Sequence, residues 1–209
     1  MPVIKELHFN FNTKLVLWEI EESKDELEQL VFLSSTDKEK LASRKSPSHQ
    51  RELLSSRASL SALGVSLDDL QFRNNGAPYI NDGQFCSLSH TFLYAAAAIS
   101  DRSIGVDVEI YRSNIIHLAP KFMHSHEAFA LENENKTALL TRLWSAKESV
   151  YKAFGTAGIH FAKQIQISPF TIHSEEGFAR LQHLGKEYSF TLHFRSIPKG
   201  EICLAIKES

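Results

Sequence analysis

The chain has 209 residues, of which 43% are hydrophobic and 23% charged, the usual mix of a soluble globular protein. At roughly 150 residues per domain, this length corresponds to one large domain or two small ones. The 23 Lys and Arg residues against 25 Asp and Glu residues give a net charge of −2. This balance excludes a polybasic nucleic-acid binder held mainly by phosphate neutralisation, although it leaves a local anion site open.

Cysteine usage and hydropathy indicate the compartment. Cys86 and Cys203 are too few for a disulfide framework and have no metal-ligand spacing. The N-terminal residues lack the apolar core of a signal peptide. The longest strongly apolar run, residues 94–99, is far shorter than the ~20 residues of a membrane span. We therefore expect a cytoplasmic protein that binds neither membrane nor nucleic acid.

The first part of the chain is predicted to pair a strand or hairpin with three helices. Polar and apolar residues alternate in patches over residues 4–21, as in strands. Helices are expected to begin at Ser23 and at Thr36, where Glu39 completes the capping-box pattern. A third helix follows Pro47 and is expected to end at Gly64.

The remainder is predicted to be strands around one helical stretch. After a turn cluster at residues 74–78, short strands are expected at residues 79–80, 84–88, 92–100 and 104–110. Residues 114–154 have helical spacing, and four strand-like runs follow, at residues 164–172, 178–184, 188–195 and 202–206. Helices combined with antiparallel strands in both halves predict an α+β fold. The turn at residues 101–103 predicts two lobes, 1–101 and 102–209.

Two carboxylates on one predicted strand form the first candidate site. Asp107 and Glu109 are two residues apart, so their side chains leave the same face of the strand. They could be the solvated face of a half-buried strand. They could also hold a hard cation, since carboxylates, waters and substrate phosphates are the usual ligands of Mg²⁺.

A helical stripe forms the second candidate. Trp144, Glu148 and Lys152 lie at positions i, i+4 and i+8, so they share one side of a helix. Glu148 and Lys152 could be a surface pair worth about 0.3–0.5 kcal/mol, and spacing does not decide whether they have a further role.

Other polar residues allow plain structural interpretations. His124 and His126 could bind zinc, but Ser125 as an N-cap with Glu127 in the first turn explains this stretch equally well. His90 lies in a polar break between apolar residues. Arg51 and Arg57 are six residues apart on a helix, so they need not converge.

The order and spacing of these features along the chain identify a family more specifically than any one feature does. Residues 104–109 (IGVDVE) and, about 35 residues later, residues 144–152 (WSAKESVYK) resemble the two signature motifs of the 4′-phosphopantetheinyl transferase superfamily, G-[IV]-D-[IV]-E and W-[ST]-x-K-E-[AS]-x-x-K. Further resemblances to this family are Ser89-His90, the turn at residues 75–80, the basic positions Arg51 and Arg57, and the stretch 122–127. The chain length resembles the long, surfactin-synthetase-activating type rather than the short trimeric type.

The resemblance implies a fold and an activity. The fold would be a pseudo-twofold pair of lobes, each with a small antiparallel sheet and helices, with the active site between them in one monomeric chain. The enzyme would transfer the 4′-phosphopantetheine arm of coenzyme A to a serine of an acyl or peptidyl carrier protein and release 3′,5′-ADP. Holo-[acyl-carrier-protein] synthase is the name of this activity.

The resemblance also assigns site residues. Asp107, Glu109 and Glu148 would hold Mg²⁺ or Mn²⁺, and Lys152 would contact the pyrophosphate. Glu127, or a water it orients, would take the serine proton, so the catalytic set is Glu127, Glu148 and Lys152. Coenzyme A would be bound by Arg51, Arg57, Ser89, His90, Lys147 and Lys152, with Lys147 left open between a phosphate contact and a solvent-facing lysine.

Two departures from the family pattern and two rival functions stay open. Ala77 replaces a lysine that usually binds phosphate in this family, and Thr91 replaces a serine but keeps the hydroxyl. The same carboxylates could serve a metal-dependent phosphatase or nuclease. The chain could also be a non-catalytic module that binds coenzyme A or a carrier protein.

Overall fold

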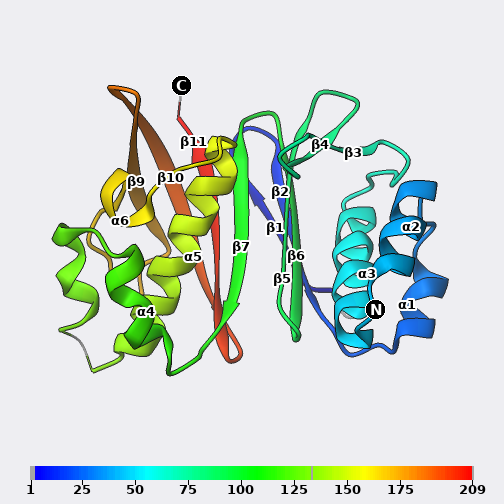
Figure 1. Ribbon diagram of the computed structural model, residues 1–209, viewed down its shortest axis with the longest axis horizontal. Helices are drawn as coiled ribbons and strands as arrows, with labels where there is room; N and C mark the ends of the chain where they lie inside the picture. The colour runs from blue at the N-terminus through cyan, green and yellow to red at the C-terminus, as the bar shows by residue number, and fades with distance from the viewer. Residues whose placement is uncertain (1–2, 133, 209) are drawn as a thin grey trace. The chain divides into compact units, whose positions relative to one another are not determined.

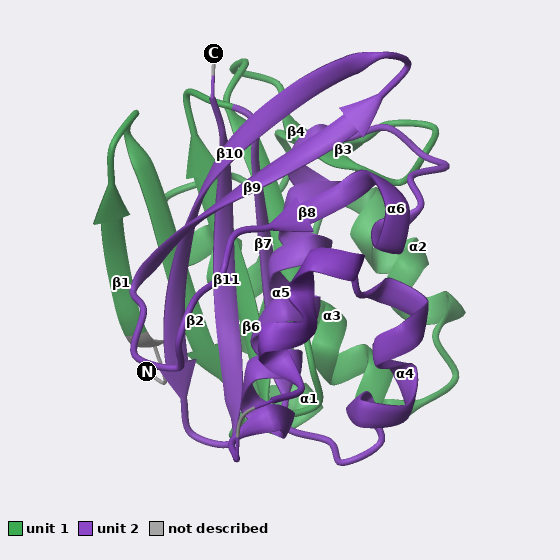
Figure 2. Cartoon of the chain, turned by 90° about the vertical axis from the view of Figure 1, so that its left-hand side faces the viewer, with its two compact units in different colours: residues 1–102 green, residues 103–209 purple. Residues whose placement is uncertain are grey.

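The computed structural model describes residues 3–132 and 134–208, and the chain divides into two compact units, residues 1–102 and 103–209 (Figure 2). The division falls one residue after the boundary that the sequence analysis proposes. Helices and antiparallel strands occur in both units, so the predicted α+β class is confirmed. Among the described residues, none of the helices has the length and apolar character needed to cross a membrane.

Unit 1 contains an antiparallel sheet with the order β1–β2–β6–β5 (Figure 1). Its strands are β1 (Val3–Phe9), β2 (Thr13–Glu19), β5 (Phe85–His90) and β6 (Tyr94–Ser100). The predicted N-terminal hairpin is β1 and β2. A separate small ladder joins β3 (Leu70–Phe72) to β4 (Pro78–Ile80) across the predicted turn. The prediction missed β3, because three residues are too short to show a strand period.

Three helices accompany this sheet: α1 (Lys24–Leu30), α2 (Ser35–Ser43) and α3 (Pro47–Ala62). Ser23 caps α1 in a complete capping box, as predicted. The expected start of α2 at Thr36 is wrong, because the hydroxyl of Ser34 accepts the hydrogen bond from the backbone N–H of Asp37 instead. At the end of α3, Gly64 has a φ of +84°, the left-handed conformation that suits glycine after a helix.

Helix α3 packs on β6, whose residues 95–98 are all alanine and fully buried. These small side chains allow close approach of the helix, and Leu53, Leu54 and Leu60 fill the interface from the α3 side. The apolar alanine run is therefore a central strand of unit 1.

Unit 2 contains an antiparallel sheet with the order β7–β11–β10–β9–β8. The strands are β7 (Ile104–Ile110), β8 (Ile165–Ile167), β9 (Glu176–His183), β10 (Lys186–Ile197) and β11 (Gly200–Lys207), which confirms the strands predicted there. The predicted helical stretch divides into α4 (Ile115–Phe122), the 3₁₀ helix η1 (Ser125–Ala130) and α5 (Lys136–Phe154). A short helix, α6 (Phe161–Gln164), was not predicted.

The long helix α5 lies across the sheet of unit 2 and packs on β7 and β11 (Figures 1 and 2). Gly105 makes the contact with β7 unusually close. A Cβ atom at this position would lie 2.0 Å from the carbonyl oxygen of Ser149 and 2.6 Å from the amide nitrogen of Ala153. The glycine of the first motif is therefore required for the backbone of β7 to reach the backbone of α5.

A buried ion pair also anchors α5 to the sheet. Arg142 and Glu201 are 2% and 0% exposed, and their nearest N–O distance is 2.8 Å. The guanidinium of Arg142 also donates to Ser196 and to the carbonyl oxygens of Thr171 and Ser174. Because these donors have acceptors, the pair avoids the cost of an isolated buried charge, and it fixes the first half of α5.

Candidate active site on strand β7 and helix α5

The structure brings the two motifs of the sequence together. Asp107 and Glu109 lie on the face of β7 that α5 covers, since Lys152 and Trp144 on α5 donate to their carboxylates. The residue Asp107 is 5% exposed and the Glu109 side chain is 17% exposed. This burial argues against the alternative of a solvated strand face.

Lys152 on α5 lies directly at Asp107. Its Nζ atom donates to Oδ1 of Asp107 at 2.7 Å and to the carbonyl oxygen of Val106 at 3.0 Å. The Lys152 side chain is 28% exposed, so part of it faces solvent. The interpretation of Lys152 as one half of a plain surface pair with Glu148 is therefore too simple, because its nearest carboxylate belongs to β7.

Glu109 is held by two donors on opposite sides of its carboxylate. The indole Nε1 of Trp144 donates to Oε1 at 3.0 Å, and Nη2 of Arg112 donates to Oε2 at 2.7 Å. The Trp144 ring packs against Phe122 and Phe161, with centroid distances of 5.1 and 5.5 Å. Sequence reasoning placed Trp144 on the right stripe but did not identify its partner, because helical spacing carries no information about the neighbouring strand.

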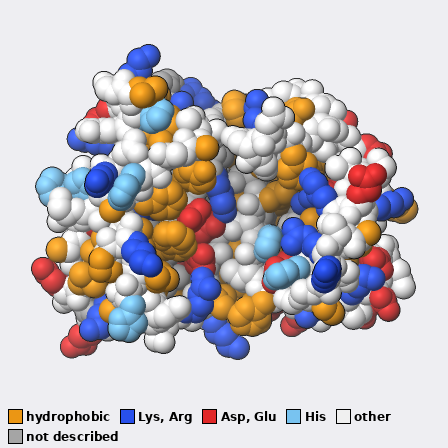
Figure 3. Space-filling model, in the orientation of Figure 1, with side chains coloured by type: hydrophobic (Ala, Val, Ile, Leu, Met, Phe, Trp, Pro, Cys, Tyr) orange, Lys and Arg blue, Asp and Glu red, His pale blue; other side chains and the backbone are white. Residues whose placement is uncertain are grey.

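The three carboxylates of the candidate site repel one another. Burial, followed by the charges of Asp107 and Glu109, raises the pKa of Glu148 to about 7, although Lys152 opposes this shift. Burial and the charge of Asp107 likewise raise the pKa of Glu109. Acidic side chains gather over α5 and β7 in the space-filling view, with Lys and Arg side chains beside them (Figure 3). The site is a region of concentrated negative charge that a cation would stabilise.

The chemistry of this donor set fits a hard divalent cation, since carboxylate oxygens are the ligands that Mg²⁺ prefers. The described side chains are not arranged as a finished coordination shell, however: within residues 3–132 and 134–208, no group of three His, Cys, Asp or Glu side chains is placed to hold a metal ion. Lys152 lies on Asp107, and Arg112 and Trp144 lie on Glu109. In this arrangement the cations of the chain itself balance the carboxylates.

Glu127, the predicted general base, lies in the interior of unit 2. It is 0% exposed, and its carboxylate pairs with Nζ of Lys147 at 2.8 Å. The backbone N–H groups of His124 and Ile167 donate to the same carboxylate at 2.6 and 2.8 Å. With both oxygens occupied inside the fold, Glu127 joins η1 to α5 and β8, and its role as a proton acceptor stays a prediction.

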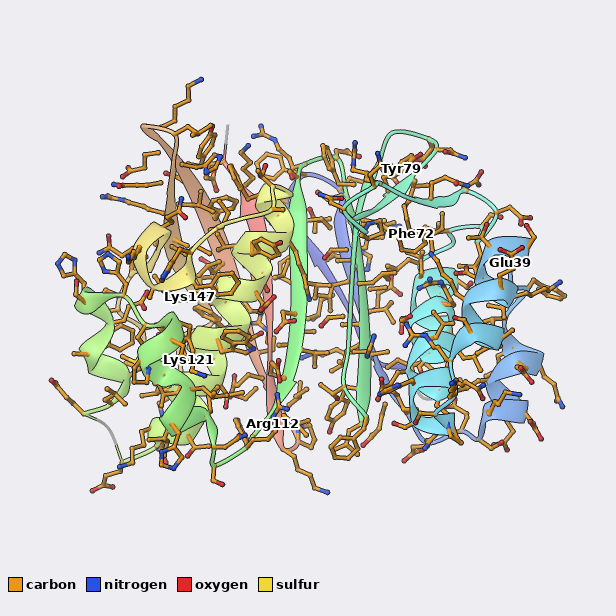
Figure 4. All side chains as sticks on the ribbon, in the orientation of Figure 1. Glu39, Phe72, Tyr79, Arg112, Lys121 and Lys147 are labelled. Carbon is orange, nitrogen blue, oxygen red and sulfur yellow. The ribbon has the colours of Figure 1, made fainter. Side chains whose placement is uncertain are left out.

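Lys147 is also buried, which contradicts the alternative of a solvent-facing lysine, while the phosphate contact stays a prediction. It is 0% exposed and donates to the carbonyl oxygen of Ile165 at 2.7 Å in addition to its pair with Glu127 (Figure 4). Burial lowers the pKa of Lys147, and the charge of Glu127 opposes this effect. The amine therefore lies inside unit 2, away from solvent.

We expect Lys147→Met to lower the free energy of unfolding by about 3–5 kcal/mol, because it leaves the Glu127 carboxylate buried without its counter-ion. Adding Glu127→Gln to this variant should recover part of the loss. Urea unfolding followed by circular dichroism measures both. If Lys147→Met were as stable as the wild type, the pair would not be the buried link described here.

The residues of unit 1 that are predicted to bind coenzyme A mostly contact other residues of unit 1. Arg57 is 4% exposed and pairs with Asp37 at 2.8 Å, which ties α3 to α2. Arg51 donates to the carbonyl oxygens of Glu22 and Ile20 at 2.9 and 3.1 Å. Arg57 is therefore buried, and Arg51 is bound to the backbone that leads from β2 to α1, so a phosphate contact by either arginine stays a prediction.

Ser89 and His90 end strand β5 beside helix α3. Ser89 is 7% exposed, whereas the His90 side chain is 37% exposed. The Nδ1 atom of His90 lies 3.5 Å from a carboxylate oxygen of Glu52 on α3. Of the candidate residues in unit 1, His90 has the ring that a ligand could reach, and Glu52 is a partner that the sequence analysis did not assign.

The histidines near η1 follow the structural interpretation rather than the zinc alternative. Nδ1 of His124 accepts a hydrogen bond from the backbone N–H of His126 at 3.3 Å, and His124 rather than Ser125 is the N-cap. The His126 ring lies 3.0 Å from the side-chain amide of Gln166. These contacts account for both imidazoles as parts of the start of η1.

Comparison with known proteins agrees with the geometry. Residues 103–207 match the profile of the 4′-phosphopantetheinyl transferase superfamily. The chain is 30% identical to the 4′-phosphopantetheinyl transferase HetI of Nostoc sp. over 173 residues, which cover 73% of each protein. It is 42% identical over 81 residues to enterobactin synthase component D of Salmonella typhi, covering 37% of this chain and 35% of the relative.

A further relative is the 4′-phosphopantetheinyl transferase gsp of Aneurinibacillus migulanus. It is 26% identical over 157 residues, which cover 73% of this chain and 64% of that protein. The chain thus spans less than two thirds of this relative and about three quarters of the Nostoc protein.

Proposed function

Because the chain belongs to the 4′-phosphopantetheinyl transferase superfamily, we propose that it transfers the 4′-phosphopantetheine arm of coenzyme A to a serine of an acyl or peptidyl carrier protein. The products would be the holo-carrier and 3′,5′-ADP. The observation that carries this proposal is the junction of the two motifs, where Lys152 of α5 lies 2.7 Å from Asp107 of β7 and Glu148 shares their electrostatic field.

The carboxylates Asp107, Glu109 and Glu148 would hold Mg²⁺ or Mn²⁺. When bound, the cation would neutralise the pyrophosphate of coenzyme A and the charge that develops on the leaving group. The support for this assignment is that burial, together with the charge of Asp107, raises the pKa of both Glu109 and Glu148. Three carboxylates gathered in a partly buried place, where their charges oppose one another, favour a bound cation.

Lys152 would bind a pyrophosphate oxygen. Its ammonium group is partly exposed and already lies at the carboxylate cluster, one helical turn after Glu148. A lysine in this place supplies a mobile point charge to phosphate. The buried pair of Glu127 and Lys147 would act indirectly, by fixing η1 and β8 beside α5.

The adenine and 3′-phosphate side of coenzyme A would be contacted by unit 1, with His90 as the contact that its exposure favours. Arg51 and Arg57 would support this region through α3 instead of touching the ligand. We propose that the enzyme works as a monomer in the cytoplasm, since its two units each have their own core.

Ala77 offers a gain-of-function prediction. Relatives in this family usually have a phosphate-binding lysine here, and Ala77 lies in the partly exposed turn before β4. Ala77→Lys should therefore bind coenzyme A several-fold more tightly, by roughly the 1 kcal/mol of a charge-assisted contact. Isothermal calorimetry with coenzyme A measures the change, and Asn75→Lys in the same turn is the control. Equal affinities for wild type and Ala77→Lys would remove the role given to this position.

The activity is tested by incubating the protein with apo acyl carrier protein, coenzyme A and Mg²⁺ and weighing the carrier by mass spectrometry. The proposal predicts a phosphopantetheine increment on the carrier serine, and none on a carrier whose serine is replaced by alanine. No increment on any carrier would contradict the transferase. Inorganic phosphate released in its place would favour the metal-dependent hydrolase, and coenzyme A binding with no product would favour the non-catalytic module.

A further inference from the structure

We propose that Arg112 is an exchangeable counter-ion of Glu109, which a divalent cation must displace, so that this arginine sets the metal affinity of the β7–α5 site. The proposal rests on the metal-binding part of the proposed function. It adds a residue outside both sequence motifs.

The position of Arg112 carries the first step. It lies two residues after the end of β7, where its label stands beside the lower end of the strand in Figure 4. Its Nη2 atom lies 2.7 Å from Oε2 of Glu109. The Arg112 side chain is 57% exposed, while the Glu109 side chain is 17% exposed. The guanidinium thus approaches a largely buried carboxylate from the solvent side, and it can leave without opening the core.

The two partners of Glu109 differ in how firmly they are held. Trp144 donates to the other carboxylate oxygen, and its ring is packed against Phe122 and Phe161. An indole fixed in this way keeps Glu109 oriented whatever its second oxygen does. Arg112, in contrast, has a long and exposed side chain. One oxygen therefore has a fixed donor and the other has a donor that can be exchanged.

Lys152 on Asp107 is a weaker candidate for such exchange. Its side chain is only 28% exposed, and Nζ also donates to the carbonyl oxygen of Val106. Among the residues that the structure describes, the Arg112 guanidinium donates to one acceptor, the Glu109 carboxylate. A divalent cation would therefore break fewer contacts by replacing Arg112 at Glu109 than by replacing Lys152 at Asp107.

A competition follows from this geometry. A divalent cation gains the Glu109 oxygen only after the Arg112 pair is broken, and a half-exposed ion pair of this kind is weak enough to be broken reversibly. Arg112→Gln removes the competing charge and should bind a divalent cation about fivefold more tightly. Arg112→Lys keeps a cation at the same place, so its affinity should stay close to that of the wild type.

The test is isothermal calorimetry of the whole protein with MnCl₂ in the absence of coenzyme A, at low and at high salt. Arg180→Gln is the matched control, because Arg180 is also an exposed arginine of unit 2 paired with a glutamate, Glu187, at 3.9 Å. The proposal predicts tighter binding for Arg112→Gln only, with a smaller difference at high salt. Equal affinities of Arg112→Gln and Arg180→Gln, or weaker binding by Arg112→Gln, would overturn it.

Failure of the inference and failure of the proposed function are distinguishable. If neither wild type nor Arg112→Gln binds Mn²⁺, the metal site itself is wrong and the inference falls with it. If wild type binds Mn²⁺ and Arg112→Gln binds it equally, only the role of Arg112 is wrong. Binding by Arg112→Gln with none by wild type would be the strongest support.

Trp144 offers a second readout that is independent of activity and of heat. The chain has two tryptophans, and Trp18→Phe leaves Trp144, which touches Glu109 directly, as the source of indole fluorescence. Mn²⁺ titrations of Trp18→Phe and of Trp18→Phe with Arg112→Gln should give midpoints that differ by the same factor of about five. Midpoints that coincide would contradict the competition.

Discussion

Gly105→Ala is expected to lower the free energy of unfolding by about 3 kcal/mol or more, the upper end of what overpacking costs. The added Cβ atom would lie 2.0 Å from the carbonyl oxygen of Ser149 and 2.6 Å from the amide nitrogen of Ala153. Both are backbone atoms of α5, so no side chain can turn away to make room. Strand β7 must then move away from α5 and take Asp107 with it, and we expect transfer activity to be lost even in the fraction that folds.

Gly177→Ala is the matched control for this prediction. The atoms nearest to its new Cβ are ring carbons of Phe194, the closest at 2.7 Å, which belong to a side chain and can shift. Its cost should therefore be clearly smaller, and the carboxylate site should stay intact. Urea unfolding and the carrier assay measure both variants. A Gly105→Ala protein as stable and as active as the wild type would show that β7 and α5 do not make the close contact described here.

Glu148→Gln is expected to reduce transfer more than about 100-fold, because it removes one of the three carboxylates proposed to hold the metal ion. The fold should not suffer. Burial and the charges of Asp107 and Glu109 raise the pKa of Glu148 from 4.5 to about 7, so the ionised carboxylate destabilises the folded chain. The stabilising contribution of this group is complete below pH 4.5 and is lost as the pH rises through about 7.

The glutamine variant has no such loss. In EDTA, its stability relative to the wild type should therefore increase from pH 5 to pH 8, by on the order of 1 kcal/mol after screening by solvent. Mg²⁺ should stabilise the wild type but not the variant. Glu187→Gln, at an exposed residue of β10, serves as the control for charge removal. Full activity of Glu148→Gln, or a stability difference that shrinks as the pH rises, would contradict the assignment.

Local patterns predicted most of the secondary structure. The alternation of apolar residues in β7 gave its bounds, and Ser23 and Gly64 marked helix ends because capping is decided by residues a few positions apart. Thr36 failed as a helix start because three consecutive hydroxyl residues, Ser34, Ser35 and Thr36, could each cap a helix here, and the sequence does not rank them.

The sequence predicted which residues form the carboxylate site better than it predicted what each residue does. Motif order brought Asp107, Glu109, Glu148 and Lys152 to one place, where the structure shows them coupled through short contacts and charge. The sequence did not show which charged side chains are buried. Glutamate, lysine and arginine are usually exposed. In this structure, however, Glu127 and Lys147 form one buried pair and Arg57 forms another with Asp37.

The hydrogen-bond partners of Glu109 could not be predicted from the sequence either. Arg112 belongs to neither motif, and its contact with Glu109 depends on how the chain turns after β7. The bond from Trp144 to Glu109 links residues 35 positions apart and follows from the packing of α5 on β7.

We propose that the β7–α5 site transfers phosphopantetheine to a carrier serine and does not hydrolyse coenzyme A. The most direct test measures both products of one reaction with apo acyl carrier protein, coenzyme A and Mg²⁺: 3′,5′-ADP by chromatography and holo-carrier by mass spectrometry. We predict that the two form in equal amounts, that omitting the carrier stops nucleotide release, and that Glu148→Gln forms neither. Release of nucleotide or phosphate without a carrier, or in excess over holo-carrier, would contradict the account.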